Sequence, residues 1–158
     1  MATNQKQSNP VTIQAGIKIR HAKSIDAVRI AELSGQLGYP AKPTEIAQRL
    51  RKIKPASLHA VLVAESPERE VVGWLHVSVS PLLEVQLRAE VNGLIVADDG
   101  RSRGTGALLL RAAEHWARSR GCKSMSVRSN VIRKRAHQFY LRHGYEHYKT
   151  QKAFRKPI

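Results

Sequence analysis

The chain of 158 residues is long enough for one domain with a proper core and too short for two ordinary ones. Its apolar share of 42% is normal for a globular protein, and no run approaches the ~20 apolar residues of a membrane-spanning helix, so we expect no membrane association. The formal net charge of +15 is unevenly placed, because residues 101–158 hold 15 Lys and Arg against 2 Asp and Glu. An anionic partner is therefore expected for the C-terminal part, either a polyphosphate-bearing cofactor or nucleic acid.

The first residues are polar and lack the apolar core of a secretory signal. We expect residues 1–14 to form a disordered tail and residues 15–158 to form a single domain. The one cysteine, Cys122, excludes an internal disulfide and a cysteine cluster, which favours a cytoplasmic location. The histidines of the C-terminal part show no metal-ligand spacing, so no metal is expected.

The N-terminal half begins with a predicted strand over residues 17–20, where apolar and polar residues alternate. Ser24 is expected to cap a first helix, and Pro43 opens a second one. Residues 58–64 and 71–79 are rich in β-branched residues and predict an antiparallel hairpin.

The C-terminal half continues with a strand over residues 87–96, a helix from about 102 to 121 and a strand over residues 123–128. A further helix is predicted from about 133 to 143, and residues 145–155 are expected to supply one or two closing strands. This order of elements indicates one α/β domain with a mixed sheet flanked by helices.

The segment Arg101–Gly106 lies between a predicted strand and a long helix. Glycines let the backbone approach a bulky anion, and the first amides of a helix attract negative charge. Arg101 and Arg103 add side-chain charge, so the segment suits a pyrophosphate. Neither the P-loop pattern nor the Gly-x-Gly-x-x-Gly pattern is present. The alternative is an ordinary strand–turn–helix junction whose small residues serve packing.

Three ordered blocks of residues together resemble the GNAT superfamily of acetyl-CoA-dependent N-acetyltransferases. They are Ala89-Glu90-Val91-Asn92-Gly93-Leu94-Ile95-Val96, then Arg101-x-x-Gly104-x-Gly106, and then Arg133-x-x-Ala136-His137-x-Phe139-Tyr140-x-x-x-Gly144-Tyr145. The middle block matches each fixed position of the family's loop signature, Gln/Arg-x-x-Gly-x-Gly/Ala. The resemblance implies a mixed, mostly antiparallel sheet of six to seven strands flanked by four helices. It also implies transfer of an acetyl group from acetyl-CoA to a primary amine by direct attack in a ternary complex.

The resemblance further implies which residues hold the cofactor. The backbone of Leu94, Ile95 and Val96 would pair with the pantetheine arm, in a slot where the strands 87–96 and 123–128 splay apart. The pyrophosphate would lie against a set of loop residues: Arg101, Ser102, Arg103, Gly104, Thr105, Gly106 and Ala107. The family often places an asparagine where this chain has Arg133, so either Asn130 or Arg133 is expected to contact the pantetheine arm.

Two side chains are candidates for proton transfer. The resemblance places Tyr140 where the family has the acid that protonates the departing thiolate, and a phenol suits that task. Its alternative role is core packing beside Phe139. Glu90 is the candidate base for the amine, and its alternative is a structural ion pair with a nearby arginine. His76, on the preceding strand, is a lesser candidate base.

The acceptor carries no recognisable motif, so a small-molecule amine and a protein amine are both open. Two alternative functions use the same fold: a nucleic-acid-binding module, which is less favoured, and an acyl-CoA sensor without turnover. Similar proteins are often dimers, so a homodimer is expected by analogy.

Overall fold

The computed structural model describes residues 16–53, 57–98 and 104–158. The chain divides into two compact units with the boundary between Val127 and Arg128, and each is described by itself. The expected disordered tail, residues 1–14, lies outside the described residues. No helix in the described part is long and apolar enough to cross a membrane.

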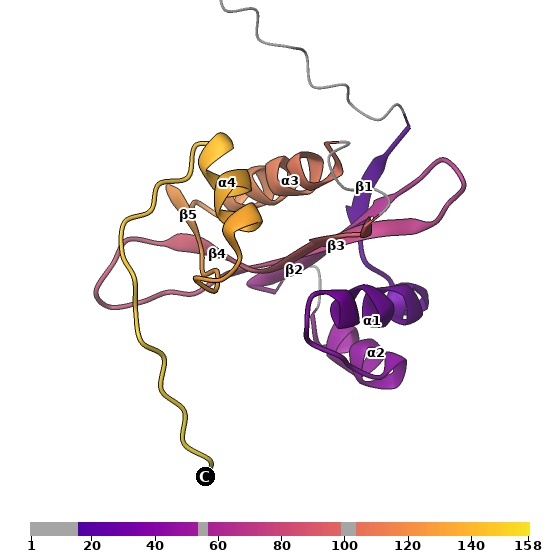
Figure 1. Ribbon diagram of the computed structural model, residues 1–158, viewed down its shortest axis with the longest axis horizontal. Coiled ribbons are helices and arrows are strands. Elements are labelled where there is room, and N and C mark those ends of the chain that lie inside the picture. The colour runs from indigo at the N-terminus through magenta and orange to yellow at the C-terminus, as the bar shows by residue number, and fades with distance from the viewer. Residues whose placement is uncertain (1–15, 54–56, 99–103) are drawn as a thin grey trace, which may run out of the picture. The chain divides into compact units, whose positions relative to one another are not determined.

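The first unit is built on a five-stranded sheet in which spatial order follows chain order (Figure 1). Its strands are β1 (Lys18–His21), β2 (His59–Glu65), β3 (Val71–Val79), β4 (Arg88–Val96) and β5 (Ser124–Val127). Neighbours from β1 to β4 are antiparallel, whereas β5 runs parallel to β4. The mixed, mostly antiparallel sheet agrees with the prediction, but the expected six to seven strands are not confirmed, since the described residues form five.

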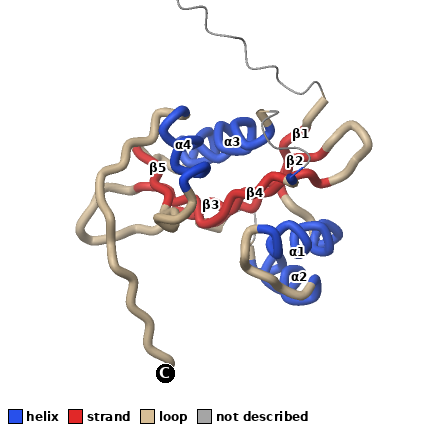
Figure 2. The backbone as a smooth tube through the Cα atoms, in the orientation of Figure 1, coloured by secondary structure: helices blue, strands red, loops and turns tan. Residues whose placement is uncertain are grey.

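Helices cover both faces of this sheet (Figure 2). The helices α1 (Ala27–Gln36) and α2 (Pro43–Lys52) lie on one face, and α3 (Thr105–Ser119) lies on the other. Both faces of the middle strands are therefore largely buried, as the exposure pattern of β2 and β3 shows. With α4 in the second unit, the described residues contain the four α-helices that were expected.

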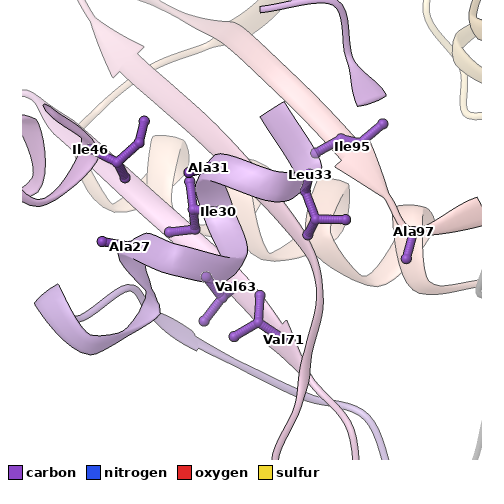
Figure 3. Packing of buried hydrophobic residues seen from close by; sticks show 9 residues of the cluster. All are labelled: Ala27, Ile30, Ala31, Leu33, Ile46, Val63, Val71, Ile95 and Ala97. Atoms are coloured by element: carbon purple, nitrogen blue, oxygen red, sulfur yellow. The ribbon is translucent and has the colours of Figure 1, made fainter. Parts of the chain in front are cut away.

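The face under α1 and α2 is held by a cluster of small and branched apolar side chains (Figure 3). Leu33 of α1 and Val63 of β2 are fully buried, and Ile95 of β4 joins them from the middle of the sheet. Because burial of one such side chain contributes about 1.5–3 kcal/mol, this cluster fixes α1 against the strands that carry the candidate site.

The entry to α1 differs from the prediction. Ser24 does not cap a helix; residues Ser24–Asp26 form a 3-10 turn, and the Asp26 carboxylate accepts a hydrogen bond of 2.7 Å from the backbone N–H of Lys23. Asp26 also takes two hydrogen bonds from Arg20 on β1, at 2.8 and 3.0 Å. The carboxylate is preferred over the serine because it satisfies the backbone and a guanidinium together.

The second unit contains α4 (Lys134–Arg142), which ends before Gly144 at a φ of 84°. Residues 145–158 form no strand, so the expected closing strands are absent from this segment. Nearly all of its side chains are exposed, and a strand needs a partner edge that a sequence pattern does not reveal.

Candidate functional site

The N-terminus of α3 is arranged to attract an anion. Gly104 precedes the helix at a φ of 85°, a left-handed conformation that glycine adopts without strain. Among the described residues, no side chain caps α3 and its first turn holds no acidic residue. By contrast, carboxylates of Asp26 and Glu45 cap the 3-10 turn and α2. The N-terminus of α3, a helix of 15 residues, therefore keeps its partial positive charge, because no acidic side chain in the first turn neutralises it.

Strand β4 has a bulge at Asn92, and only its first part is paired with β5. Across β3, Val77 pairs with Val91 but His76 pairs with Gly93, so Asn92 is the extra residue. The ladder between β4 and β5 covers Arg88–Val91 only, and β4 continues to Val96. The ladder with β5 therefore ends at the bulge, and β4 continues beyond it without pairing to β5.

The backbone direction in this last part of β4 follows from one hydrogen bond. The N–H of Ala97 donates to the carbonyl of Val72 at 2.8 Å, which places residue 97 in a hydrogen-bonded pair with β3. Such pairs alternate along an antiparallel ladder. The backbone groups of Ile95 therefore point toward β3, and those of Leu94 and Val96 point away from it.

A row of polar side chains crosses the sheet on the face that carries α1. Ser78 of β3 lies directly opposite His59 of β2 and directly opposite Glu90 of β4, so the three side chains share this face. Asn92 donates a hydrogen bond of 2.8 Å from Nδ2 to the Ser78 hydroxyl oxygen. Ser78 is buried, Glu90 is half-buried and His59 is exposed, so the row leads from the interior to the surface.

His76 extends this row along β3. Its Nε2 atom lies 3.1 Å from Nδ1 of His59, close enough for one ring to donate a hydrogen bond to the other. Burial lowers the pKa of His76 to about 4, with a smaller contribution from the neighbouring His59. At neutral pH His76 is therefore uncharged, and one of its ring nitrogens keeps a lone pair.

The second unit places Tyr140 among aromatic rings. Its ring centroid lies 5.2 Å from that of Phe139 and 5.6 Å from that of Tyr145, both in edge arrangements. Burial raises the pKa of Tyr140 to about 12, partly offset by the positive charge of Arg133. The phenol consequently stays protonated throughout the neutral range.

Asn130 and Arg133 occupy the turn that leads into α4. The side-chain oxygen of Asn130 accepts a hydrogen bond of 3.1 Å from the N–H of Ile132, and its carbonyl accepts one of 2.9 Å from the N–H of Arg133. This gives Asn130 a local role in shaping the turn. The assignment of a pantetheine contact to Asn130 or Arg133 stays a prediction.

The predicted residues thus fall into three groups. Gly104, Thr105, Gly106 and Ala107 begin α3, and Glu90 and Leu94–Val96 lie on β4. Tyr140, Asn130 and Arg133 belong to the second unit. Arg101, Ser102 and Arg103 lie outside the described residues.

Sequence reasoning missed Asn92, Ser78 and His59. They come from three strands, and only the register brings them into one row. A polar residue repeated at alternate positions, as in His76-x-Ser78 and Glu90-x-Asn92, was the available signal, because alternate residues share a face of a strand.

The geometry defines a class of protein: a mixed sheet in which the bulged strand β4 is followed by a helix whose start attracts anions. Residues 27–145 match the acetyltransferase (GNAT) family. The aminoglycoside N(6')-acetyltransferase type 1 of Klebsiella aerogenes is 33% identical over 118 residues, 73% of this chain and 77% of that protein. The aminoalkylphosphonate N-acetyltransferase of Salmonella typhimurium is 34% identical over 87 residues, 53% of this chain and 56% of that protein.

A solved structure agrees in fold. The structure of AAC(6')-Iy in complex with the bisubstrate analogue CoA-S-monomethyl-acetylneamine has a TM-score of 0.80 at 18% identity, covering 91% of this chain and 100% of that one. The chain belongs to the acetyltransferase (GNAT) family and is an N-acetyltransferase. The resemblance found in the sequence is confirmed.

Proposed function

We propose that this protein transfers the acetyl group of acetyl-CoA to a primary amine of a small molecule by direct attack. The observation that carries the proposal is the start of α3, where left-handed Gly104 leads into amides that no described side chain caps. A diphosphate suits this position because it supplies the negative charge that the helix end attracts. The Thr105 hydroxyl oxygen, buried without a hydrogen-bond partner among the described residues, adds a further polar atom to this turn.

On this proposal, the end of β4 holds the amide-bearing arm of the cofactor. Leu94 directs its N–H and C=O groups away from β3, where an extended ligand can pair with them as a strand would, and we place the arm along Leu94–Val96. We assign Ile95 a packing role, since its backbone faces β3 and its side chain belongs to the core cluster. The bound acetyl-CoA supplies an activated acyl group as its thioester.

Glu90 is the proposed proton acceptor for the amine. An alkylamine is mostly protonated at neutral pH, so it must lose a proton before it attacks. Glu90 is half-buried on β4, in the row that contains Ser78 and two residues before the bulge. A carboxylate there attracts the ammonium form and takes its proton, and the neutral amine then attacks the thioester with its freed lone pair.

Tyr140 is the proposed proton donor to the departing thiolate. Burial keeps its phenol protonated, with a pKa raised to about 12. A thiolate in water is the weaker base, with a pKa near 8.5, so transfer is favoured only when the thiolate is itself withdrawn from water. Hydrogen-bond donation by Tyr140 stabilises the leaving group even before the proton moves.

Two relatives point to a small polar amine as acceptor. One is named for aminoglycosides and the other for aminoalkylphosphonates. Both kinds of compound place a primary amine on a small, polar molecule. The polar row of Ser78, Glu90 and Asn92 suits such an acceptor better than an apolar amine, because its polar groups would lose water without replacement beside an apolar one.

The test is release of coenzyme A from acetyl-CoA with a panel of amines. The panel contains an aminoglycoside, an aminoalkylphosphonate, a polyamine, an amino acid and a lysine peptide. We expect thiol release to exceed the amine-free rate with at least one of the first two, and mass spectrometry to show one added acetyl group. Coenzyme A that neither binds in calorimetry nor is released with any amine would refute the proposal.

A further inference from the structure

The strand β1, the start of α1 and the hairpin that joins β2 to β3 border a cleft of about 700 Å³. Because β1 is an edge strand, the cleft lies at the margin of the sheet (Figure 1). Its volume falls within the range of small-molecule sites. The residues proposed above for acetyl transfer are not part of its described lining, so the cleft is a separate candidate site.

Basic side chains outnumber acidic ones along this cleft. Its five cations come from β1, from α1 with the segment before it, and from the hairpin: they are Lys18, Arg20, Lys23, Arg29 and Arg69. Four carboxylates share the lining, which leaves a surplus of one positive charge. On a chain whose formal net charge is +15, the field at the cleft therefore favours an anionic ligand.

Two of the arginines are engaged in the fold. The guanidinium of Arg20 donates hydrogen bonds to Asp26 at 2.8 and 3.0 Å and to Glu65 at 2.7 Å. Arg29 donates to the third carboxylate, Glu32, at 2.9 Å. These pairs hold β1, α1 and β2 together, so binding of a ligand is left to the other three cations.

Lys18, Lys23 and Arg69 are exposed, and none of them makes an ion pair with a residue that the structure describes. The hydrogen bond from Arg20 holds the pKa of Glu65 below its ordinary value, and the charges of Arg69 and Lys18 lower it further. Both cations therefore lie close to this carboxylate, on one wall of the cleft. Their charge is available to a ligand that enters from solvent.

Arg69 occupies a position of the hairpin that favours glycine. Its N–H closes a turn with a 2.9 Å hydrogen bond to the carbonyl of Ser66, and Pro67 is the second residue of that turn. The φ of Arg69 is 68°, and no other non-glycine residue in the described part of the chain has a left-handed backbone. Hairpins commonly place a left-handed residue after such a turn, and glycine adopts that conformation without strain.

Contacts of the hairpin tip keep Arg69 in this conformation. The N–H of Ser66 donates to the carbonyl of Glu70 at 2.8 Å. A Cβ on Gly16 would lie 2.7 Å from Pro67, so the tip packs closely against the chain that enters β1. A strained residue at a position suited to glycine indicates a use for its side chain. The side chain of Arg69 lines the cleft, which makes ligand binding the use that fits.

We propose that Arg69, together with Lys18 and Lys23, binds a small organic anion in this cleft through a phosphate or carboxylate group. A guanidinium suits both groups, because its planar fork of N–H donors matches two oxygens at once. The lysines add positive charge without requiring a fixed direction. The cleft has room for the remainder of a metabolite-sized molecule.

The experiment titrates the protein, in excess coenzyme A, with glycerol phosphate and with succinate at constant ionic strength. The two probes separate a phosphate ligand from a carboxylate ligand. Calorimetry should show saturable binding of at least one probe with a Kd below about 1 mM. The amide chemical shifts of residues 18–32 and 65–71 should move with the same Kd. Absence of saturation with both probes, or shift changes confined to the start of α3, would overturn the proposal.

The variant Arg69→Gly separates ligand binding from a structural role, because the two roles predict opposite changes. Relief of the left-handed backbone should raise the melting temperature by about 2 °C or more, whereas loss of the guanidinium should weaken binding at least about tenfold. Arg51→Ala removes an exposed cation of α2 outside the cleft and should keep the wild-type affinity. An Arg69→Gly protein with unchanged affinity, or with a lowered melting temperature, would assign the arginine to the fold and overturn the site.

Discussion

The side-chain amide of Asn92 donates a 2.8 Å hydrogen bond to the hydroxyl oxygen of Ser78, and Asn92 is the residue by which β4 exceeds β3 at the bulge. The bond therefore joins the irregular part of β4 to a buried position on β3. Glu90 and Asn92 share a face by ordinary alternation, and the bulge shifts the alternation by one residue, so that Gly93, opposite His76, lies on this face as well. The polar row depends on this geometry.

The first prediction concerns this bond. Asn92→Ala removes the donor and leaves the buried Ser78 oxygen without it, which should cost about 1 kcal/mol in free energy of unfolding. The matching change Ser78→Ala should make Asn92→Ala nearly neutral, since the partner is already gone. A double-mutant cycle by urea denaturation measures the coupling. Strictly additive costs would mean that the bond contributes nothing.

The second prediction concerns the space beside the bulge. A Cβ on Gly93 would lie 2.8 Å from two carbons of the Trp74 ring, so Gly93→Ala must displace the indole. Such overpacking should cost about 1–3 kcal/mol. Gly35→Ala is the control: nothing lies within 4 Å of its Cβ, and inside a helix it should stabilise by about 0.5–1 kcal/mol. Opposite shifts in melting temperature are expected, and equal shifts would contradict the close approach.

The third prediction separates anion binding from backbone strain at the ends of α3. Gly104 precedes α3 at φ 85°, and Gly121 follows it at φ 81° with nothing within 4 Å of its Cβ. Alanine at either position should cost about 1–2 kcal/mol of stability, because both are left-handed. Only Gly104→Ala should weaken coenzyme A binding, by about 10-fold or more if one charge-assisted amide hydrogen bond is lost. Calorimetry with both variants tests this. Equal affinities of the two variants for coenzyme A would show that the diphosphate does not bind at the start of α3.

Strong local patterns made most of this fold predictable from the sequence. The strand Val71–Val79 was predicted with its observed bounds, because β-branched residues run between clear breakers. The start of α1 was not, because Ser24 and Asp26 are both good capping residues and only the position of Arg20 decides between them. The prediction of closing strands was wrong for a related reason. Residues 145–158 carry strand-like side chains, but whether they pair depends on a free sheet edge formed by other parts of the chain.

The site was predictable where it is local and unpredictable where it depends on register. The glycines of the α3 start form one short motif, so Gly104 and Gly106 could be singled out directly. The row of His59, Ser78 and Glu90 depends on three strands and on a one-residue bulge, which reverses the face of every residue beyond it. No pattern in the sequence fixes where a bulge falls.

The fourth prediction concerns the buried ion pair at the entry to α1. Burial alone would raise the pKa of Asp26, but hydrogen bonds from Arg20 and from the backbone of Lys23 outweigh it and hold the pKa below its ordinary value of 3.8. The wild type should therefore lose stability as the pH falls below about 4. Arg20→Met leaves a buried carboxylate without its cation, which should cost about 3 kcal/mol at pH 7.

The pH dependence of that variant should reverse in sign. Without Arg20, burial dominates and the pKa of Asp26 rises above that of the unfolded chain, so acidification neutralises the carboxyl and recovers stability. Urea denaturation at pH 7 and pH 3 measures both effects. Arg118→Ala, which removes an exposed partner 3.7 Å from Glu114, is the control and should change stability by less than about 0.5 kcal/mol at either pH. A parallel decline of Arg20→Met and wild type on acidification would show that Arg20 does not set the pKa of Asp26.

The fifth prediction tests the phenol of Tyr140. Tyr140→Phe keeps the ring that packs between Phe139 and Tyr145, so stability should change little, whereas kcat should fall about 100-fold or more if the hydroxyl is the proton donor. The exposed Tyr148→Phe is the matched control in the same unit and should keep the wild-type rate. Because burial raises the pKa of Tyr140 to about 12, wild-type kcat should show no alkaline decline from this group below about pH 10. Steady-state rates from pH 6 to 10 measure both points. A Tyr140→Phe enzyme with undiminished kcat would assign the hydroxyl to packing alone and leave protonation of the thiolate to water.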